Sequence, residues 1–89
     1  MAHLTVTVYG RVQGVFFRTA AKEQADMLGI TGAARNNSDG SVRIEVEGNK
    51  QQLQIFLTWC RTGPPHARVD RVASSLSDAE TGYQEFSVS

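Results

Sequence analysis

The chain has 89 residues, of which 40% are hydrophobic and 20% are charged, and its formal net charge at pH 7 is zero. This length predicts one small domain over residues 1–89 with a single modest core. The balanced charge argues against nucleic acid and anionic membranes as partners, because both are normally bound through an excess of basic side chains.

The N-terminal sequence lacks a basic region followed by an apolar run, so no signal peptide is predicted. No stretch approaches the roughly 20 apolar residues of a membrane span. Cys60 is the single cysteine, which excludes an internal disulfide and a cysteine-based zinc site. We therefore expect a cytoplasmic protein, with a monomer as the default state.

The first half of the chain predicts a strand, a helix and a hairpin. Residues 4–9 alternate between apolar and polar side chains, as a half-buried strand does. Residues 18–28 repeat their apolar side chains at helical spacing and end at Gly29. Strands over 30–37 and 42–46 follow, joined by an Asp-Gly turn. The last of these strands has one charged face, which we expect to be solvated: Arg43, Glu45 and Glu47.

The second half predicts another helix and two more strands. Asn49 is a favourable N-cap with Gln52 in capping-box position, and the helix ends before residues 63–65, Gly-Pro-Pro. Residues 67–76 read as a strand with a bulge, and residues 83–88 as a short last strand. The helix carries an apolar stripe expected in the core: Leu53, Phe56, Leu57 and Cys60, widened by Ile55 and Trp59. Both histidines, His3 and His66, are expected at the surface.

This order of elements corresponds to two split βαβ halves. It predicts an α+β sandwich, in which an antiparallel sheet of four to five strands carries both helices on one face.

The turn between the first strand and the first helix is a candidate anion site. Gly10 and Gly14 lie four residues apart, and Arg18 follows where the helix should begin. Backbone N–H groups of a tight turn and of a helix N-terminus can converge on a small dianion, and a guanidinium adds a bidentate charge. The spacing matches neither nucleotide-binding glycine motif. The alternative is a plain strand-to-helix turn with a solvated arginine.

Asn36 is a second candidate, at the end of the second predicted strand. Asn36 and Ala34 are two residues apart in the strand, so their side chains are predicted to lie on the same inward, apolar side. An amide in that position needs a hydrogen-bond partner. One interpretation is that it binds the backbone beside the hairpin turn. The other is that it holds a water or an oxygen next to the anion site.

At this point the sequence resembles a known family. Residues 10–18, Gly-Arg-Val-Gln-Gly-Val-Phe-Phe-Arg, are followed by 29–32, Gly-Ile-Thr-Gly, and then by Arg35-Asn36. Residues 39–42, Asp-Gly-Ser-Val, and the Gly-Pro-Pro segment complete a pattern that closely resembles the acylphosphatase family over nearly the whole chain.

The resemblance implies a ferredoxin-like fold and hydrolysis of the carboxyl–phosphate bond of small acyl phosphates to carboxylate and inorganic phosphate. It implies that Arg18 binds the phosphate and that Asn36 orients the attacking water. The backbone cradle would comprise Gln13, Gly14, Val15, Phe16, Phe17 and Arg18. No metal and no cofactor are expected, and the partner is a small acyl phosphate.

Two positions depart from the family pattern. Ala33-Ala34 replaces a larger aromatic-plus-aliphatic pair, and Phe16 is larger than the residue often found there. Two alternative functions share the scaffold: a non-catalytic phosphate-binding protein and an RNA-recognition-type module. The latter needs exposed aromatic side chains on the central strands. The outward positions there carry instead Thr5, Thr7, Arg43 and Glu45.

Overall fold

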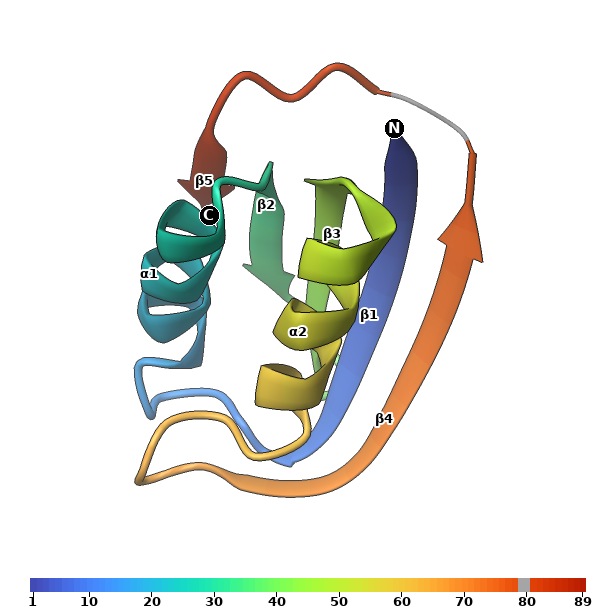
Figure 1. The fold of residues 1–89 in the computed structure, drawn as a ribbon. Coiled ribbons are helices and arrows are strands. Elements are labelled where there is room, and N and C mark those ends of the chain that lie inside the picture. The colour runs from blue at the N-terminus through green and yellow to red at the C-terminus, as the bar shows by residue number, and fades with distance from the viewer. Residues whose placement is uncertain (79–80) are drawn as a thin grey trace.

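The computed structural model describes residues 1–78 and 81–89. They form one five-stranded sheet, with both helices packed on the same face (Figure 1). In chain order the elements are β1 Ala2–Arg11, α1 Phe17–Leu28, β2 Thr31–Asn36, β3 Val42–Gly48, α2 Lys50–Cys60, β4 Arg68–Ser77 and β5 Phe86–Val88.

The strand order across the sheet is β4-β1-β3-β2-β5. The pairs β1–β3, β1–β4 and β2–β3 are antiparallel, whereas β5 runs parallel to β2. The predicted ferredoxin-like α+β sandwich is therefore confirmed, but the sheet is mixed rather than wholly antiparallel. The reason is that the chain leaves β4 at one edge and returns beside β2 at the opposite edge, running in the same direction as β2 (Figure 1).

The core lies between the sheet and the helices. The helix-facing side chains of β1 and β3 are completely buried, among them Val6, Val8, Ile44 and Val46. Helix α1 contributes Phe17, Ala21 and Ala25, and α2 contributes Leu53, Phe56, Leu57 and Cys60. Burial also raises the pKa of the Cys60 thiol, which therefore acts as a small apolar side chain, as predicted.

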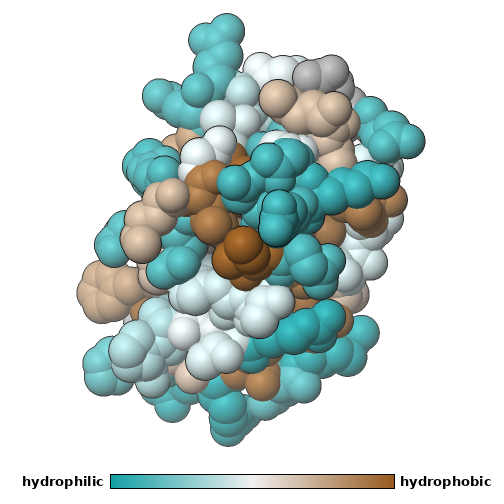
Figure 2. Space-filling model, in the orientation of Figure 1, coloured by the Kyte–Doolittle hydropathy of each residue, from teal (hydrophilic) through white to brown (hydrophobic). Residues whose placement is uncertain are grey.

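Helix α2 begins as the sequence predicts. The Asn49 side chain accepts a hydrogen bond from the backbone N–H of Gln52 at 3.0 Å, which satisfies one of the unpaired donors at the helix start. With 12 and 11 residues, neither helix of the described chain is long and apolar enough to cross a membrane. On the helix-bearing face, Figure 2 shows a short apolar patch surrounded by hydrophilic side chains.

The predicted bulge in β4 is confirmed, and it lies where β1 ends. Tyr9 pairs with Arg71, but the next residue, Gly10, pairs with Val69. Gly10 has φ of 132°, and a Cβ there would lie 2.1 Å from the carbonyl oxygen of Arg68. Only glycine allows this approach. The bulge therefore fixes the direction in which the chain enters the turn before α1.

The outer face of the sheet, opposite the helices, differs from the sequence prediction. His3 and Glu47 were expected to be solvated, but they are only 6% and 2% exposed. The segment before β5 covers them: the Glu47 carboxylate accepts hydrogen bonds from the backbone N–H groups of Thr81 and Gly82, and from His3 Nδ1 at 2.8 Å. The predictions for these two residues were wrong because a long-range connection crosses this face. His66 is exposed, as predicted.

Candidate phosphate-binding site

Residues 13–18 run from the connection after β1 into the first turn of α1, and we call them the cradle. Its buried side chains alternate with exposed residues: Val15 and Phe17 pack into the core, whereas Gly14 and Phe16 are exposed. The buried side chains anchor the segment to the core. The backbone between them is therefore held at the surface in a fixed shape.

The backbone of the cradle turns into the left-handed region twice. Gly14 has φ of 75°, and Phe16 has φ of 62° and ψ of 26°. Phe16 is the one non-glycine residue with positive φ in the described part of the chain. A bulky side chain rarely adopts this conformation, and residues held in it cluster at binding and catalytic sites.

The backbone N–H groups of the cradle lack acceptors in the part of the chain that the structure describes. Helix α1 has no side-chain cap, and the first backbone hydrogen bond at its start runs from the N–H of Ala20 to the carbonyl of Phe16, at 3.0 Å. Within residues 1–78 and 81–89, no hydrogen bond uses a backbone N–H group of residues 13–19. Free N–H groups at the positive end of a helix favour a bound anion. The cradle therefore has the donors that an oxyanion requires.

Arg18 is the second residue of α1, and its side chain reaches the end of β5. Nη1 donates a hydrogen bond to the backbone oxygen of Ser89. One turn later, Lys22 Nζ donates to the carbonyl of Phe86 at 3.0 Å. These two bonds fasten β5 to α1. A guanidinium carries five N–H donors, so Arg18 retains donors for an anion beside the cradle.

Asn36 is the last residue of β2 and pairs with the buried Val42. It lies on the helix-facing side of the sheet, as the parity with Ala34 predicts. Its side chain is nevertheless exposed, because the strand ends there. The expectation that a buried amide must find a partner was therefore wrong for this residue. An exposed amide is free to contact a ligand or a water.

The hydrogen bonds of Ser89 show where Arg18 lies relative to Asn36. Its oxygen accepts from Arg18, and its N–H donates to the carbonyl of Ala34 at 3.0 Å. Asn36 lies two residues beyond Ala34 on the same face, a distance of about 7 Å along a strand. Arg18 and Asn36 are thus located at the same end of the domain and on the same side of the sheet.

The Gln13 side chain ties the cradle to the β2–β3 hairpin. Its Nε2 donates to the carbonyl of Asn37 at 2.8 Å and to that of Ser41 at 2.9 Å. The sequence predicted only a backbone role for Gln13, because nothing local indicates which distant carbonyls its amide will meet. The hairpin closes through the N–H of Asn37 and the carbonyl of Ser41, so its loop has three residues, 38–40, and is longer than the predicted Asp-Gly turn.

Asp39 is the carboxylate closest to Asn36 along the chain. Its Oδ1 accepts hydrogen bonds from the hydroxyl of Ser41 at 2.5 Å and from the backbone N–H of Ser41 at 2.9 Å. These bonds lower the pKa of Asp39 below its usual value. The ionised Asp39 therefore stabilises the hairpin, and it is poorly suited to accept a proton near neutral pH.

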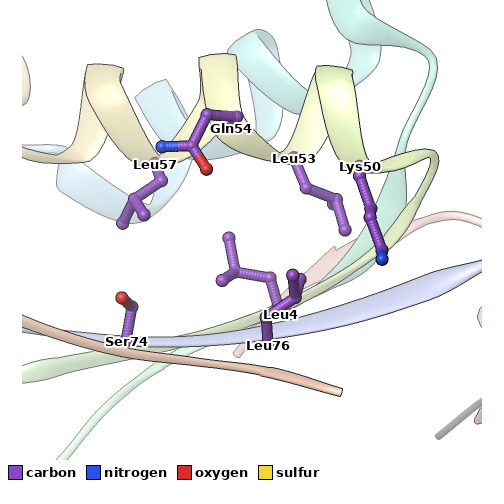
Figure 3. Close-up of a pocket in the computed structure, with 7 residues that line it drawn as sticks. All are labelled: Leu4, Lys50, Leu53, Gln54, Leu57, Ser74 and Leu76. Atoms are coloured by element: carbon purple, nitrogen blue, oxygen red, sulfur yellow. The ribbon is translucent and has the colours of Figure 1, made fainter. Parts of the chain in front are cut away.

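The cradle lies at the surface, where Gly14 and Phe16 are exposed, and it is not part of either of two hollows in the structure. A hollow of about 270 Å³ between α2 and strands β1 and β4 is lined by Leu4, Leu53, Leu57 and Leu76, with Lys50 at one end (Figure 3). A second hollow of about 260 Å³ lies beside β2. Neither is lined by Arg18 or Asn36. A ligand on the cradle would therefore leave part of its surface in solvent.

Comparison with known proteins identifies the family. A family model described as Acylphosphatase matches residues 4–88. The acylphosphatase of Methylococcus capsulatus is 48% identical over 88 residues, which cover 99% of this chain and 96% of that protein. The acylphosphatase of Deinococcus radiodurans is 46% identical over 96% of this chain and 97% of its own length. The crystal structure of acylphosphatase from Bacillus subtilis superposes with a TM-score of 0.97 at 34% identity, covering 100% of this chain and 99% of that one. The chain therefore belongs to the acylphosphatase family.

Proposed function

We propose that this protein hydrolyses the carboxyl–phosphate bond of small acyl phosphates to carboxylate and inorganic phosphate, without a metal ion. The observation that carries the proposal is the uncapped start of α1, whose N–H groups lack acceptors within the described residues and stand beside Arg18. Membership of the acylphosphatase family supports the same substrate class.

The phosphoryl group binds in the cradle. Its oxygens accept hydrogen bonds from the backbone N–H groups of Gln13, Gly14, Val15, Phe16, Phe17 and Arg18, and the Arg18 guanidinium adds a charged contact. Ser89 orients this guanidinium, because it accepts one of its N–H groups. Donors fixed before the substrate arrives stabilise charge without reorganisation during the reaction.

In the chemical step, a water molecule attacks phosphorus and the bond between phosphorus and the acyl oxygen breaks. The bonding electrons leave with the acyl group as a carboxylate, which is a good leaving group. Asn36 orients the water, and the water's proton passes to the phosphate, since an amide is not a base at neutral pH. Charge spreads over the equatorial phosphoryl oxygens in the transition state, where the cradle and Arg18 bind it more strongly.

The test of this function is the hydrolysis of a simple aromatic acyl phosphate. The rate is measured with and without a chelator for the wild type, Arg18→Ala and Asn36→Ala. We expect chelator-insensitive turnover by the wild type. Arg18→Ala should raise KM and lower kcat, with kcat falling about 10²- to 10³-fold. Asn36→Ala should lower kcat with little change in KM.

Arg61→Ala is the matched control, because Arg61 is exposed on the connection after α2 and its side chain forms no ion pair within the described residues. It should retain wild-type kinetics. An inert wild type, or an Arg18→Ala variant as active as Arg61→Ala, would overturn the proposal. So would a rate profile that requires an enzyme base with a pKa of about 6 to 7.

A further inference from the structure

The second hollow, of about 260 Å³, lies on the outer face of the sheet, near the edge formed by β2 and β5. Its lining includes Ala33, Arg35, Arg43, Glu45, Tyr83 and Ser89. We propose that this hollow is a second anion site, which binds a phosphate group between the guanidinium groups of Arg35 and Arg43. This inference does not depend on the proposed catalytic function.

Two like charges face each other across the hollow. Arg35 on β2 pairs directly with Arg43 on β3, so their side chains leave the same face of the sheet from adjacent positions. Like charges at such positions destabilise a sheet. Within the described residues Arg35 forms no ion pair, and the one carboxylate near Arg43 belongs to Glu45. An oxyanion bound between the two guanidinium groups would replace this repulsion with two attractions.

Arg43 also carries a buried donor that lacks an acceptor. Its Nε is inaccessible to solvent and forms no hydrogen bond with any described residue. The nearest carboxylate oxygen, Oε2 of Glu45, is 3.9 Å away, which is too far for a hydrogen bond. Buried donors without a partner are rare in folded proteins, because leaving one unpaired is unfavourable. Rotation of the Arg43 side chain toward the hollow would expose this donor to a phosphate oxygen, which would supply the missing acceptor.

The charge of the lining favours an anion despite the presence of Glu45. The lining contains two guanidinium groups and one side-chain carboxylate, that of Glu45. This carboxylate already contacts another side chain, because its Oε1 lies 3.2 Å from Nε2 of His3. Arginine binds phosphate oxygens through paired N–H groups. The Arg35–Arg43 pair therefore favours phosphate over a neutral ligand.

The size of the hollow depends on the small side chain of Ala33. This residue pairs with Glu45 on the outer face and lines the hollow together with the two arginines and Tyr83. Tyr83 forms a wall, and its position is fixed by stacking on His3 at 6.3 Å between ring centroids. The volume is small for a binding pocket, so the ligand should be inorganic phosphate or a small phosphate monoester.

Ser89 lies between this hollow and the cradle. It lines the hollow, while its backbone oxygen accepts a hydrogen bond from Arg18. Any test with phosphate must therefore separate binding at the two places. An Arg18→Ala background weakens the cradle and replaces no residue that lines the hollow, and Ser89 keeps its backbone hydrogen bond to Ala34.

The experiment titrates the Arg18→Ala protein with inorganic phosphate at low ionic strength and follows the backbone amides by ¹H–¹⁵N NMR. We expect saturable shifts at residues 33, 35, 43 and 83, with an affinity separate from that of any shifts at residues 13–18. Adding Arg43→Gln should weaken this binding about tenfold or more, because a charged hydrogen bond is lost. Adding Ala33→Phe should abolish it by filling the hollow while leaving the charge unchanged.

Arg71→Gln, in the same background, is the control. Arg71 lies on the same outer face, with its guanidinium over the ring of Tyr9. Its replacement removes the same charge as Arg43→Gln does, but away from the hollow. The protein that carries Arg71→Gln should bind phosphate with the same affinity as the Arg18→Ala protein. Shifts confined to residues 13–18, an absence of shifts, or equal binding by the Arg43→Gln and Arg71→Gln proteins would overturn the proposal. If Ala33→Phe does not fold, the comparison of these two arginine variants decides the question.

Discussion

The side-chain amide of Gln13 donates a hydrogen bond to the backbone carbonyl of Asn37 at 2.8 Å, and so joins the cradle to the β2–β3 hairpin. The same nitrogen donates to Ser41, on the other side of the hairpin, at 2.9 Å. Asn36 directly precedes Asn37. One amide therefore fixes the phosphate-binding cradle relative to the residue proposed to orient water, and small errors in such geometry lower reaction rates strongly.

Replacing Gln13 should affect the rate more than the affinity. Gln13→Ala removes both hydrogen bonds, so we expect kcat to fall about tenfold and the free energy of unfolding to fall by about 1–2 kcal/mol. Gln13→Glu should be worse than alanine, because a carboxylate would face two carbonyl oxygens. Steady-state kinetics and urea unfolding measure both effects. Gln51→Ala, at an exposed position on α2, is the control. Equal kcat values for Gln13→Ala and wild type would contradict the positioning role.

The buried Glu47 should make stability depend on pH in the acid range. Burial alone would raise its pKa, but the hydrogen bonds from His3 and from the N–H groups of Thr81, Gly82 and Tyr83 outweigh burial and lower it from 4.5 to about 2. The ionised carboxylate therefore stabilises the folded state above pH 4.5, and this stabilisation is lost as the pH falls toward 2. Its magnitude is on the order of 3 kcal/mol.

Glu47→Gln tests this assignment. The variant should unfold more easily at neutral pH, and its free energy of unfolding should vary less between pH 5 and pH 2 than that of the wild type. Chemical unfolding at a series of pH values measures the difference. Glu85→Gln, at an exposed position of the same connection, should retain the wild-type pH dependence. A Glu47→Gln curve parallel to that of wild type would show that this carboxylate is not the group responsible.

Gly10 and Gly14 should respond differently to alanine although both have positive φ. At Gly10 a Cβ would lie 2.1 Å from a carbonyl oxygen of β4, whereas at Gly14 a Cβ meets nothing within 4 Å. We expect Gly10→Ala to destabilise the fold by about 3 kcal/mol or more, and Gly14→Ala by about 1 kcal/mol, through its φ alone. Thermal or urea unfolding compares them. Similar losses would mean that close approach to β4 is not what requires Gly10.

Phe16 should influence which acyl groups are accepted. Its side chain is 78% exposed and stands in the cradle, so an aromatic acyl group can pack against it while the phosphate is bound. Phe16→Ala should lower kcat/KM several-fold for an aromatic acyl phosphate and leave acetyl phosphate nearly unchanged. Phe16→Gly should show the same change in selectivity and relieve the left-handed conformation, which costs about 1 kcal/mol in a bulky residue. Equal losses for both substrates would exclude this contact.

The sequence by itself determined the local features. Apolar alternation located the strands, the 3.6-residue period located both helices, and Asn49 marked the start of α2. These features depend on neighbouring residues, whose spacing is visible in one dimension. The bulge opposite Gly10 was also predictable, since the alternation of β4 breaks at Val69 and Val72. Arg18 and Asn36 were candidates from their positions in the sequence, and the resemblance to the acylphosphatase family then implied their roles.

The tertiary structure decided what depends on residues far apart in the chain. Gln13 meets carbonyls 24 and 28 residues away, and Arg18 meets Ser89, 71 residues away. Glu47 is buried by a segment more than 30 residues later in the chain, although its own strand marks it as solvated. Such contacts arise from the strand order, above all from β5 returning to the edge beside β2. No pattern of neighbouring residues encodes that return, because the paired residues of the two strands, such as Gly32 and Phe86, are far apart in the chain.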